Sequence, residues 1–184
     1  MGTDEKFLTD IKTLRDRARR EIERGSVTPG YKADSAAVCR VLNEALATEI
    51  VCVLRYKRHA AMAKGIHAQA VAEEFTEHAA EEQEHADQIA ERIVQLGGEP
   101  DYSPVTLTAR SHSEYKEGDG IVDMLREDLV AERVAIESYS EIARWLGDGD
   151  LTSRRLMERI LEREEEHADD LASLLAGIDQ RASL

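Results

Sequence analysis

Glu82-Gln83-Glu84-His85-Ala86-Asp87 and Glu164-Glu165-Glu166-His167-Ala168-Asp169 are nearly identical stretches of this 184-residue chain. Each stretch has a Glu three residues before a His, and residues three apart lie on the same face of a helix. A further Glu precedes each stretch at a matched distance, because Glu49 lies 33 residues before Glu82 and Glu132 lies 32 residues before Glu164. Four carboxylates and two imidazoles with this spacing are the ligand set of a two-metal site inside a four-helix bundle.

Chance alone does not explain this double pattern. Glu occupies 24 of the 184 positions, so a single Glu-x-x-His among six His is expected by accident. Two such motifs, each with a partner Glu at a matched distance, are much harder to obtain. In each predicted helix the glutamate also falls on the apolar stripe, where a bundle normally has leucine. We therefore interpret the four glutamates as buried and functional, and not as part of solvated acidic faces.

Buried carboxylates need compensation. A buried ionised carboxylate costs several kcal/mol unless it is paired, and typical domains are stable by only ~5–15 kcal/mol. Two divalent cations would supply the compensation. Mixed carboxylate and imidazole ligands without thiolate favour iron, or manganese as an alternative, over a closed structural zinc site.

The composition indicates one all-α protein. The chain has three Pro, few aromatic residues and a formal charge of -14, which argues against nonspecific nucleic-acid binding. It has no apolar run near the ~18 residues of a membrane span and no signal-peptide core at its N-terminus. Cys39 and Cys52 fall thirteen residues apart on one predicted helix, too far for a disulfide. Free thiols and a missing signal core predict a cytoplasmic protein.

Periodicity and helix-breaking residues predict five helices. Residues 1–33 form an N-terminal helix and a linker, and residues 34–184 form the bundle. The N-terminal helix has an apolar stripe that we expect to pack on a neighbouring surface. The expected helices run approximately over Asp4–Arg24, Asp34–Lys64, His67–Leu96, Gly120–Leu146 and Leu151–Leu175.

Loop lengths predict the topology. Short connections at Gly65 and at Gly147–Asp150 each join an antiparallel pair. The connection Gly97–Asp119 could span about 70 Å when extended, whereas a thirty-residue helix is about 45 Å long. It can therefore cross the whole bundle, which gives two antiparallel hairpins joined by one long crossover.

Other residues near the motifs have open roles. His78 shares the face of His85 and could form an auxiliary cation site with Glu77 and Glu81, although a solvated or hydrogen-bonded His fits equally well. His59 is a candidate for supporting the metal ligands, with a structural core histidine as the alternative.

From Leu42 to Leu175 the chain resembles bacterioferritin and its ferritin-like relatives. The segment from Glu49 to Met62 keeps that family's Glu, Tyr, His and Met at their mutual spacings, and Glu82-x-x-His85-Ala86-Asp87 and Asp128-Leu129-x-x-Glu132 also match. The resemblance implies a ferritin-like four-helix bundle with a di-iron ferroxidase centre. Glu82 and Glu164 would bridge the two irons. The implied terminal ligands and catalytic tyrosine are Glu49, Glu132, His85, His167 and Tyr56.

The implied activity is oxidation of Fe(II) by dioxygen or hydrogen peroxide, with ferric mineral stored in a homo-oligomeric cage. Gln83 stands where bacterioferritin has its haem methionine, which counts against haem. The short segment after His167 and the extra N-terminal helix resemble Dps-like proteins with a bacterioferritin-type centre. They favour twelve subunits over twenty-four.

Three alternatives stay open at this point. A di-iron or di-manganese enzyme could destroy peroxide without storing mineral. A Dps-like protein could protect DNA, although the acidic charge and the lack of a basic tail count against it. A metal-free helical assembly module would leave the polar core positions without an explanation.

Overall fold

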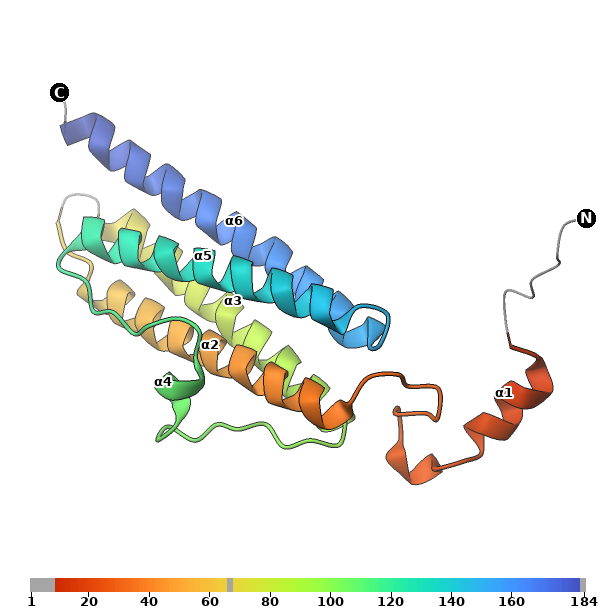
Figure 1. Cartoon of the computed structure of the whole chain (residues 1–184). Coiled ribbons are helices and arrows are strands. Elements are labelled where there is room, and N and C mark those ends of the chain that lie inside the picture. Colours follow the sequence, from red (N-terminus) through yellow and green to blue (C-terminus); the bar gives the residue numbers. More distant parts are fainter. Residues whose placement is uncertain (1–8, 66–67, 183–184) are drawn as a thin grey trace, which may run out of the picture.

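The computed structural model describes residues 9–65 and 68–182, with side chains up to residue 178, and within these ranges it is all helical without strands (Figure 1). Four long helices form a bundle, as predicted. Their bounds are α2 Ser35–Met62, α3 Ala68–Gln95, α5 Ile121–Leu146 and α6 Leu151–Ala182.

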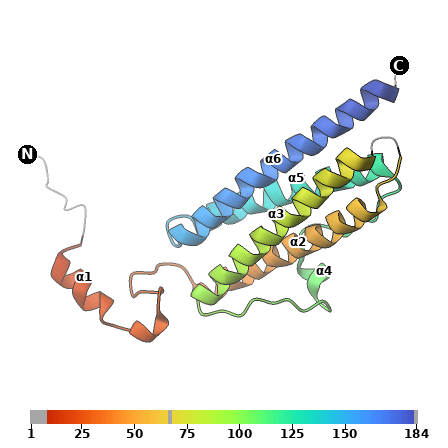
Figure 2. The same ribbon diagram turned by 180° about the vertical axis from the view of Figure 1, so that it is seen from behind.

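The bundle consists of two antiparallel hairpins. Helix α2 packs along α3, and α5 packs along α6 (Figures 1 and 2). Helix α2 starts at Asp34, whose side chain accepts hydrogen bonds from the backbone N–H groups of Ala36 and Ala37. Helix α5 ends at Gly147, which adopts a positive φ of 46° before the short turn into α6.

One long crossover joins the hairpins, as the loop lengths predicted. It runs back along the bundle from the end of α3 to the start of α5 (Figure 1). The connection, which is not among the five predicted helices, contains the short helix α4, Leu107–Arg110. Leu107 is buried against Ala47 and Val51 of α2, so a local apolar contact holds this helical turn in place.

Polar ligand positions separate two apolar clusters along the bundle axis. One cluster, with Leu42, Ile93 and Met157, fills the end where α2 begins. The other, with Phe75 and Leu171, fills the opposite end. The candidate metal centre therefore lies in a layer between two close-packed regions, which fix the rotamers of its side chains.

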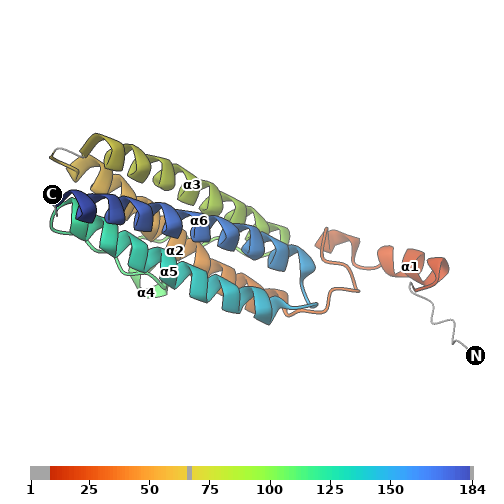
Figure 3. The same ribbon diagram turned by 90° about the horizontal axis from the view of Figure 1, so that it is seen from above.

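The N-terminal helix differs from the expectation. The predicted Asp4–Arg24 helix is only α1, Ile11–Ala18, followed by a 3-10 turn, Ile22–Arg24, and residues 4–8 lie outside the described part. Glu21 has a φ of 53°, in the left-handed region that a continuous helix cannot contain. Helix α1 projects away from the bundle (Figure 3), and within the described part of the chain its apolar side chains are exposed, with Ile11 57% exposed.

The linker between α1 and the bundle is anchored. Val27 is buried in the bundle core, and the Tyr31 hydroxyl donates a hydrogen bond to Asp150 at the start of α6. A domain boundary at residue 33 stays a prediction.

Helix α6 continues seven residues beyond the predicted end at Leu175. Among the described residues, no helix combines the length and apolarity that a membrane crossing requires.

Candidate metal centre

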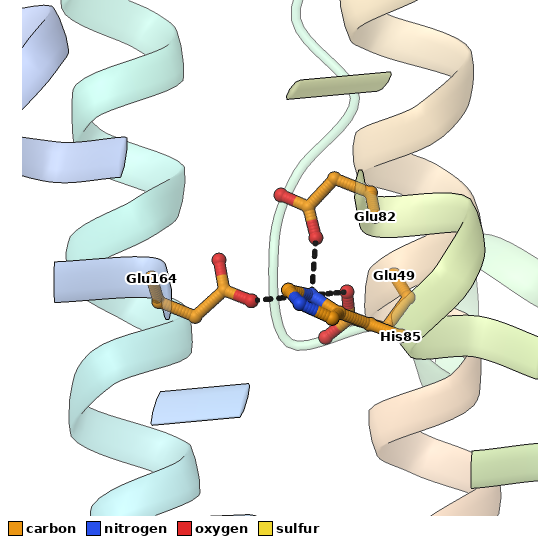
Figure 4. Close-up of side chains that lie close together, drawn as sticks. All are labelled: Glu49, Glu82, His85 and Glu164. Carbon is orange, nitrogen blue, oxygen red and sulfur yellow. Dashed lines mark hydrogen bonds and ion pairs between the residues drawn. The ribbon is translucent and has the colours of Figure 1, made fainter. Parts of the chain in front are cut away.

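The structure brings all six predicted ligands together in the bundle core. Each is at most 7% exposed, so the predicted burial is confirmed. They form two overlapping groups whose ligand atoms lie within 4.8 Å of one another, and Glu82 and Glu164 belong to both. Figure 4 shows the first group. The groups are Glu49, Glu82, His85 and Glu164, and Glu82, Glu132, Glu164 and His167.

Both histidines turn Nδ1 toward the carboxylates. In the first group Nδ1 of His85 lies 3.0 Å from Glu164 Oε1 and 3.3 Å from Glu82 Oε2 (Figure 4). In the second group Nδ1 of His167 lies 3.6 Å from Glu164 Oε2 and 3.7 Å from Glu82 Oε1. Glu82 and Glu164 thus face both histidines, which is the placement required of bridging ligands.

Several buried polar atoms in this layer lack hydrogen-bond partners among the described residues. Buried polar atoms are nearly always hydrogen-bonded, and buried charges are paired or bind metals. Cations between the carboxylates would satisfy these atoms, so the side chains fit a pair of divalent ions. The atoms are Glu49 Oε2, Glu82 Oε1, Glu132 Oε2, both carboxylate oxygens of Glu164, and His167 Nδ1.

Two tyrosines hold the outer glutamates across the bundle. The Tyr56 hydroxyl on α2 donates a short hydrogen bond to Glu132 on α5. The Tyr139 hydroxyl on α5 donates a short hydrogen bond to Glu49 on α2. Each tyrosine therefore orients the carboxylate of the other hairpin. Sequence reasoning missed Tyr139, although each tyrosine follows its own helix's glutamate by seven residues.

Glu81 supports His167 from outside the centre. Its Oε2 lies 2.6 Å from His167 Nε2, and Arg163 donates to its Oε1 at 2.9 Å. A carboxylate on the second imidazole nitrogen fixes the ring so that Nδ1 can face a metal. One of the two sequence interpretations of His78 grouped it with Glu77 and Glu81, and in the structure Glu81 contacts His167. Glu77 is exposed.

His59 belongs to a buried ion-pair cluster beside the centre. Asp128 accepts hydrogen bonds from Arg55 Nε at 2.7 Å and pairs with His59 Nδ1 at 2.8 Å, and all three side chains are at most 1% exposed. Arg55 and His59 flank Tyr56 on α2, while Asp128 lies one turn before Glu132 on α5. The cluster therefore joins the two hairpins next to the Tyr56–Glu132 hydrogen bond.

A family model of the ferritin-like domain matches residues 39–181. This chain belongs to the ferritin-like family. Bacterioferritin from Desulfovibrio desulfuricans is 31% identical over 133 residues, which cover 72% of this chain and 70% of the relative. A nutrient stress-induced DNA-binding protein from a Nostoc species is 34% identical over 146 residues, covering 77% and 79%.

A solved structure agrees with this assignment. The dodecameric thioferritin of Bacteroides fragilis, a bacterioferritin-related protein, is 33% identical and has a TM-score of 0.79. The match covers 83% of this ferritin-like chain and 92% of the other. The predicted resemblance and fold class are thereby confirmed.

Burial and the close carboxylates shift the pKa values of several groups in this layer. Burial, together with neighbouring Glu82, raises the pKa of Glu49 to about 8. Burial and the carboxylates of Glu82 and Glu164 also raise the pKa of Glu132 well above its usual range. Burial would lower the pKa of His167, but the nearby carboxylates of Glu164 and Glu82 raise it to about 11. The pKa of His85 is also raised, because the nearby carboxylates of Glu164, Glu49 and Glu82 outweigh its burial.

A Tyr139→Phe substitution tests the crossed tyrosines. We expect Mn(II) affinity to fall about 10–100-fold at one of two sites per chain, because Glu49 loses the donor that orients it. Anaerobic isothermal titration calorimetry measures this loss. Tyr102→Phe is the matched control, since Tyr102 is 50% exposed and away from the centre. Equal affinities in both variants would show that the hydrogen bond does not orient the ligand.

Proposed function

We propose that this ferritin-like protein is a ferroxidase that also stores iron. Glu49, Glu82, His85, Glu132, Glu164 and His167 would hold two irons, with Glu82 and Glu164 between them. The main support is that several buried carboxylate oxygens in this layer lack hydrogen-bond partners among the described residues. A metal-free assembly module would have no use for such a buried cluster of carboxylates and imidazoles, since burying a charged group costs several kcal/mol unless the charge is compensated.

The proposed chemistry matches a site for two adjacent substrate ions. Each Fe(II) loses one electron, and the two electrons together reduce dioxygen with two protons to hydrogen peroxide. They would equally reduce hydrogen peroxide with two protons to two water molecules. Tyr56 and Tyr139 keep the outer carboxylates in place, and Glu81 keeps the His167 ring turned inward. We assign Tyr56 this positioning role.

Relatives support the choice of iron. A solved bacterioferritin from D. desulfuricans, 28% identical with a TM-score of 0.71, has a diiron site. Manganese would suit the same oxygen and nitrogen ligands, so the bound metal needs its own measurement. Haem is not proposed, because Gln83 provides no thioether at the position of the bacterioferritin haem ligand.

The proposal is tested by adding Fe(II) aerobically to metal-free protein. Iron in each particle is counted after size-exclusion chromatography. We expect oxidation faster than in buffer, and many more than two irons per chain retained in soluble particles. Peroxide consumption with only two retained metals per chain would favour the peroxide-destroying alternative. Iron that precipitates as fast as in buffer would refute both.

A hollow assembly of twelve subunits is proposed, because a lone bundle could not keep ferric oxide soluble. The B. fragilis relative is dodecameric. The exposed stripe of α1, with Ile11 and Leu14, would then be covered by a neighbouring subunit. We expect analytical ultracentrifugation to give about twelve times the chain mass of 20.6 kDa. A monomer or dimer mass would refute storage, whereas a 24-chain mass would contradict only the cage size.

Metal binding should release protons. At pH 7 the raised pKa values of Glu49, His85 and His167 keep these groups protonated when no metal is bound. A metal requires their deprotonated forms, so affinity should fall as the pH falls, about tenfold per pH unit for each proton released. Anaerobic Mn(II) calorimetry in buffers of different ionisation enthalpy counts the protons. Heats independent of the buffer would contradict this expectation.

Nucleic-acid binding is not proposed for this chain. Two of its relatives are named DNA-binding proteins, but a net charge of -14 repels phosphates. The same charge would attract Fe(II) to acidic parts of a cage.

A cytoplasmic location stays a prediction. Cys39 and Cys52 are buried and form no disulfide with each other.

A further inference from the structure

A second cluster of ligand-type side chains lies beside the proposed iron centre. Glu74 and His78 on α3 and Asp170 on α6 place one ligand atom each within 4.8 Å of one another. His78 is 2% exposed, the Glu74 side chain is 28% exposed, and Asp170 is exposed. The cluster therefore extends from exposed Asp170 at the surface to buried His78 in the core.

The His78 ring is held by groups of the centre itself. It stacks on His167 with ring centroids 4.0 Å apart and an interplanar angle of 22°. Its Nδ1 lies 3.3 Å from the Tyr56 hydroxyl. These two contacts direct Nε2 outward, where it lies 3.3 Å from Glu74 Oε1.

Hydrogen bonding determines which His78 nitrogen has the free lone pair. The Tyr56 hydroxyl donates a hydrogen bond to Glu132, which must be ionised when it binds a metal. The tyrosine oxygen can then only accept, so Nδ1 of His78 donates to it. In a neutral imidazole this leaves Nε2 as an acceptor facing the Glu74 carboxylate. Two acceptors in contact repel each other unless a cation lies between them.

The two repeats of the Glu-x-x-His motif have different side chains at the positions that correspond to this cluster. His78 lies four residues before Glu82, and the matching position before Glu164 is Ile160, which is 1% exposed and apolar. Glu74 and Asp170 likewise correspond to Leu156 and Gln88 in the repeat. The cluster is thus absent from the repeat-related position. Its imidazole occupies a core position where an apolar side chain fits.

We infer that Nε2 of His78 and the carboxylates of Glu74 and Asp170 bind a third divalent cation next to His167. Mixed nitrogen and oxygen ligands suit Mn(II), Fe(II), Co(II) or Zn(II). The choice of Fe(II) as the natural cation rests on the proposed function. Binding of a divalent cation by these three residues does not depend on it.

Anomalous diffraction from crystals of the full chain soaked in Co(II) tests this site. We expect three peaks per chain, two in the centre and a third at about 2.1 Å from His78 Nε2. A combined Glu74→Gln and Asp170→Asn variant should lose the third peak and keep the other two. The matched control combines Glu73→Gln and Asp169→Asn, which neutralises the exposed acids next in sequence and should keep all three peaks.

Equilibrium dialysis with Co(II) gives the same comparison in solution. The Glu74 and Asp170 variant should bind one Co(II) fewer per chain than the control variant. Two centre peaks without a third would overturn this inference and leave the proposed function intact. A third peak that survives in the Glu74 and Asp170 variant would also overturn it. Missing centre peaks in the unmodified protein would instead refute the proposed function.

Discussion

Replacing Glu82 and Glu164 together with Ala should abolish binding of both proposed metals. Each of these carboxylates faces both histidines, so their loss removes two of the four ligands from each group. Loss of one supporting hydrogen bond typically lowers metal affinity 10–100-fold, and loss of two direct ligands should exceed about 100-fold at each site. Anaerobic Fe(II) titration should then show no stoichiometric binding. Aerobic oxidation should fall to the rate in buffer.

The matched control replaces Glu84 and Glu165 with Ala. These exposed glutamates lie on the same two helices, so the control removes the same charge without touching the core. It should bind two Fe(II) per chain and oxidise them normally. Circular dichroism and ultracentrifugation should show both variants folded and equally assembled. If the Glu82 and Glu164 variant still bound two Fe(II) per chain, the assigned centre would be wrong.

Asp128→Asn should cause the largest loss of stability. Asp128 is fully buried and pairs with both Arg55 and His59, so its neutralisation leaves a buried guanidinium without a counter-charge. Breaking a buried ion pair from one side costs about 3–5 kcal/mol. We expect the free energy of unfolding of the metal-free protein to fall by this amount. Urea denaturation followed by circular dichroism measures it.

Glu137→Gln is the control for this substitution. Glu137 lies on the same helix but is exposed, so its neutralisation should change the free energy of unfolding by less than about 0.5 kcal/mol. If the urea denaturation curves of the two variants had equal midpoints and slopes, the Arg55–Asp128–His59 cluster would not stabilise the fold. Metal-free protein is required, because bound metal would add its own stabilisation.

The sequence determined the bundle and the core positions of the six proposed ligands. Helical periodicity, turn residues and loop lengths are local properties, and they predicted α2, α3, α5 and α6 within a few residues at most ends. The matched spacing of Glu49 and Glu132 to the two Glu-x-x-His motifs placed all six side chains in one core layer. This worked because a helix face follows directly from residue spacing.

Tertiary structure decided the contacts between helices. Which tyrosine reaches which glutamate depends on how α2 and α5 face each other, so the crossed Tyr56–Glu132 and Tyr139–Glu49 bonds were not predicted. Pairing of Glu81 with His167, and of His78 with Asp170, likewise depends on the register of α3 against α6. Spacing within one helix contains no information on that register.

In the N-terminal segment, residue spacing predicted a longer helix than the structure contains. Its apolar stripe predicted one long helix, and the chain instead breaks at Glu21, while Ile22 is 72% exposed in the single chain. Most helical stability comes from packing an apolar face, and a single chain gives this stripe no partner surface. The sequence by itself therefore determined where apolar and ligand side chains lie on each helix. Only the packed structure decided which of those faces meet, because that depends on surfaces distant in sequence.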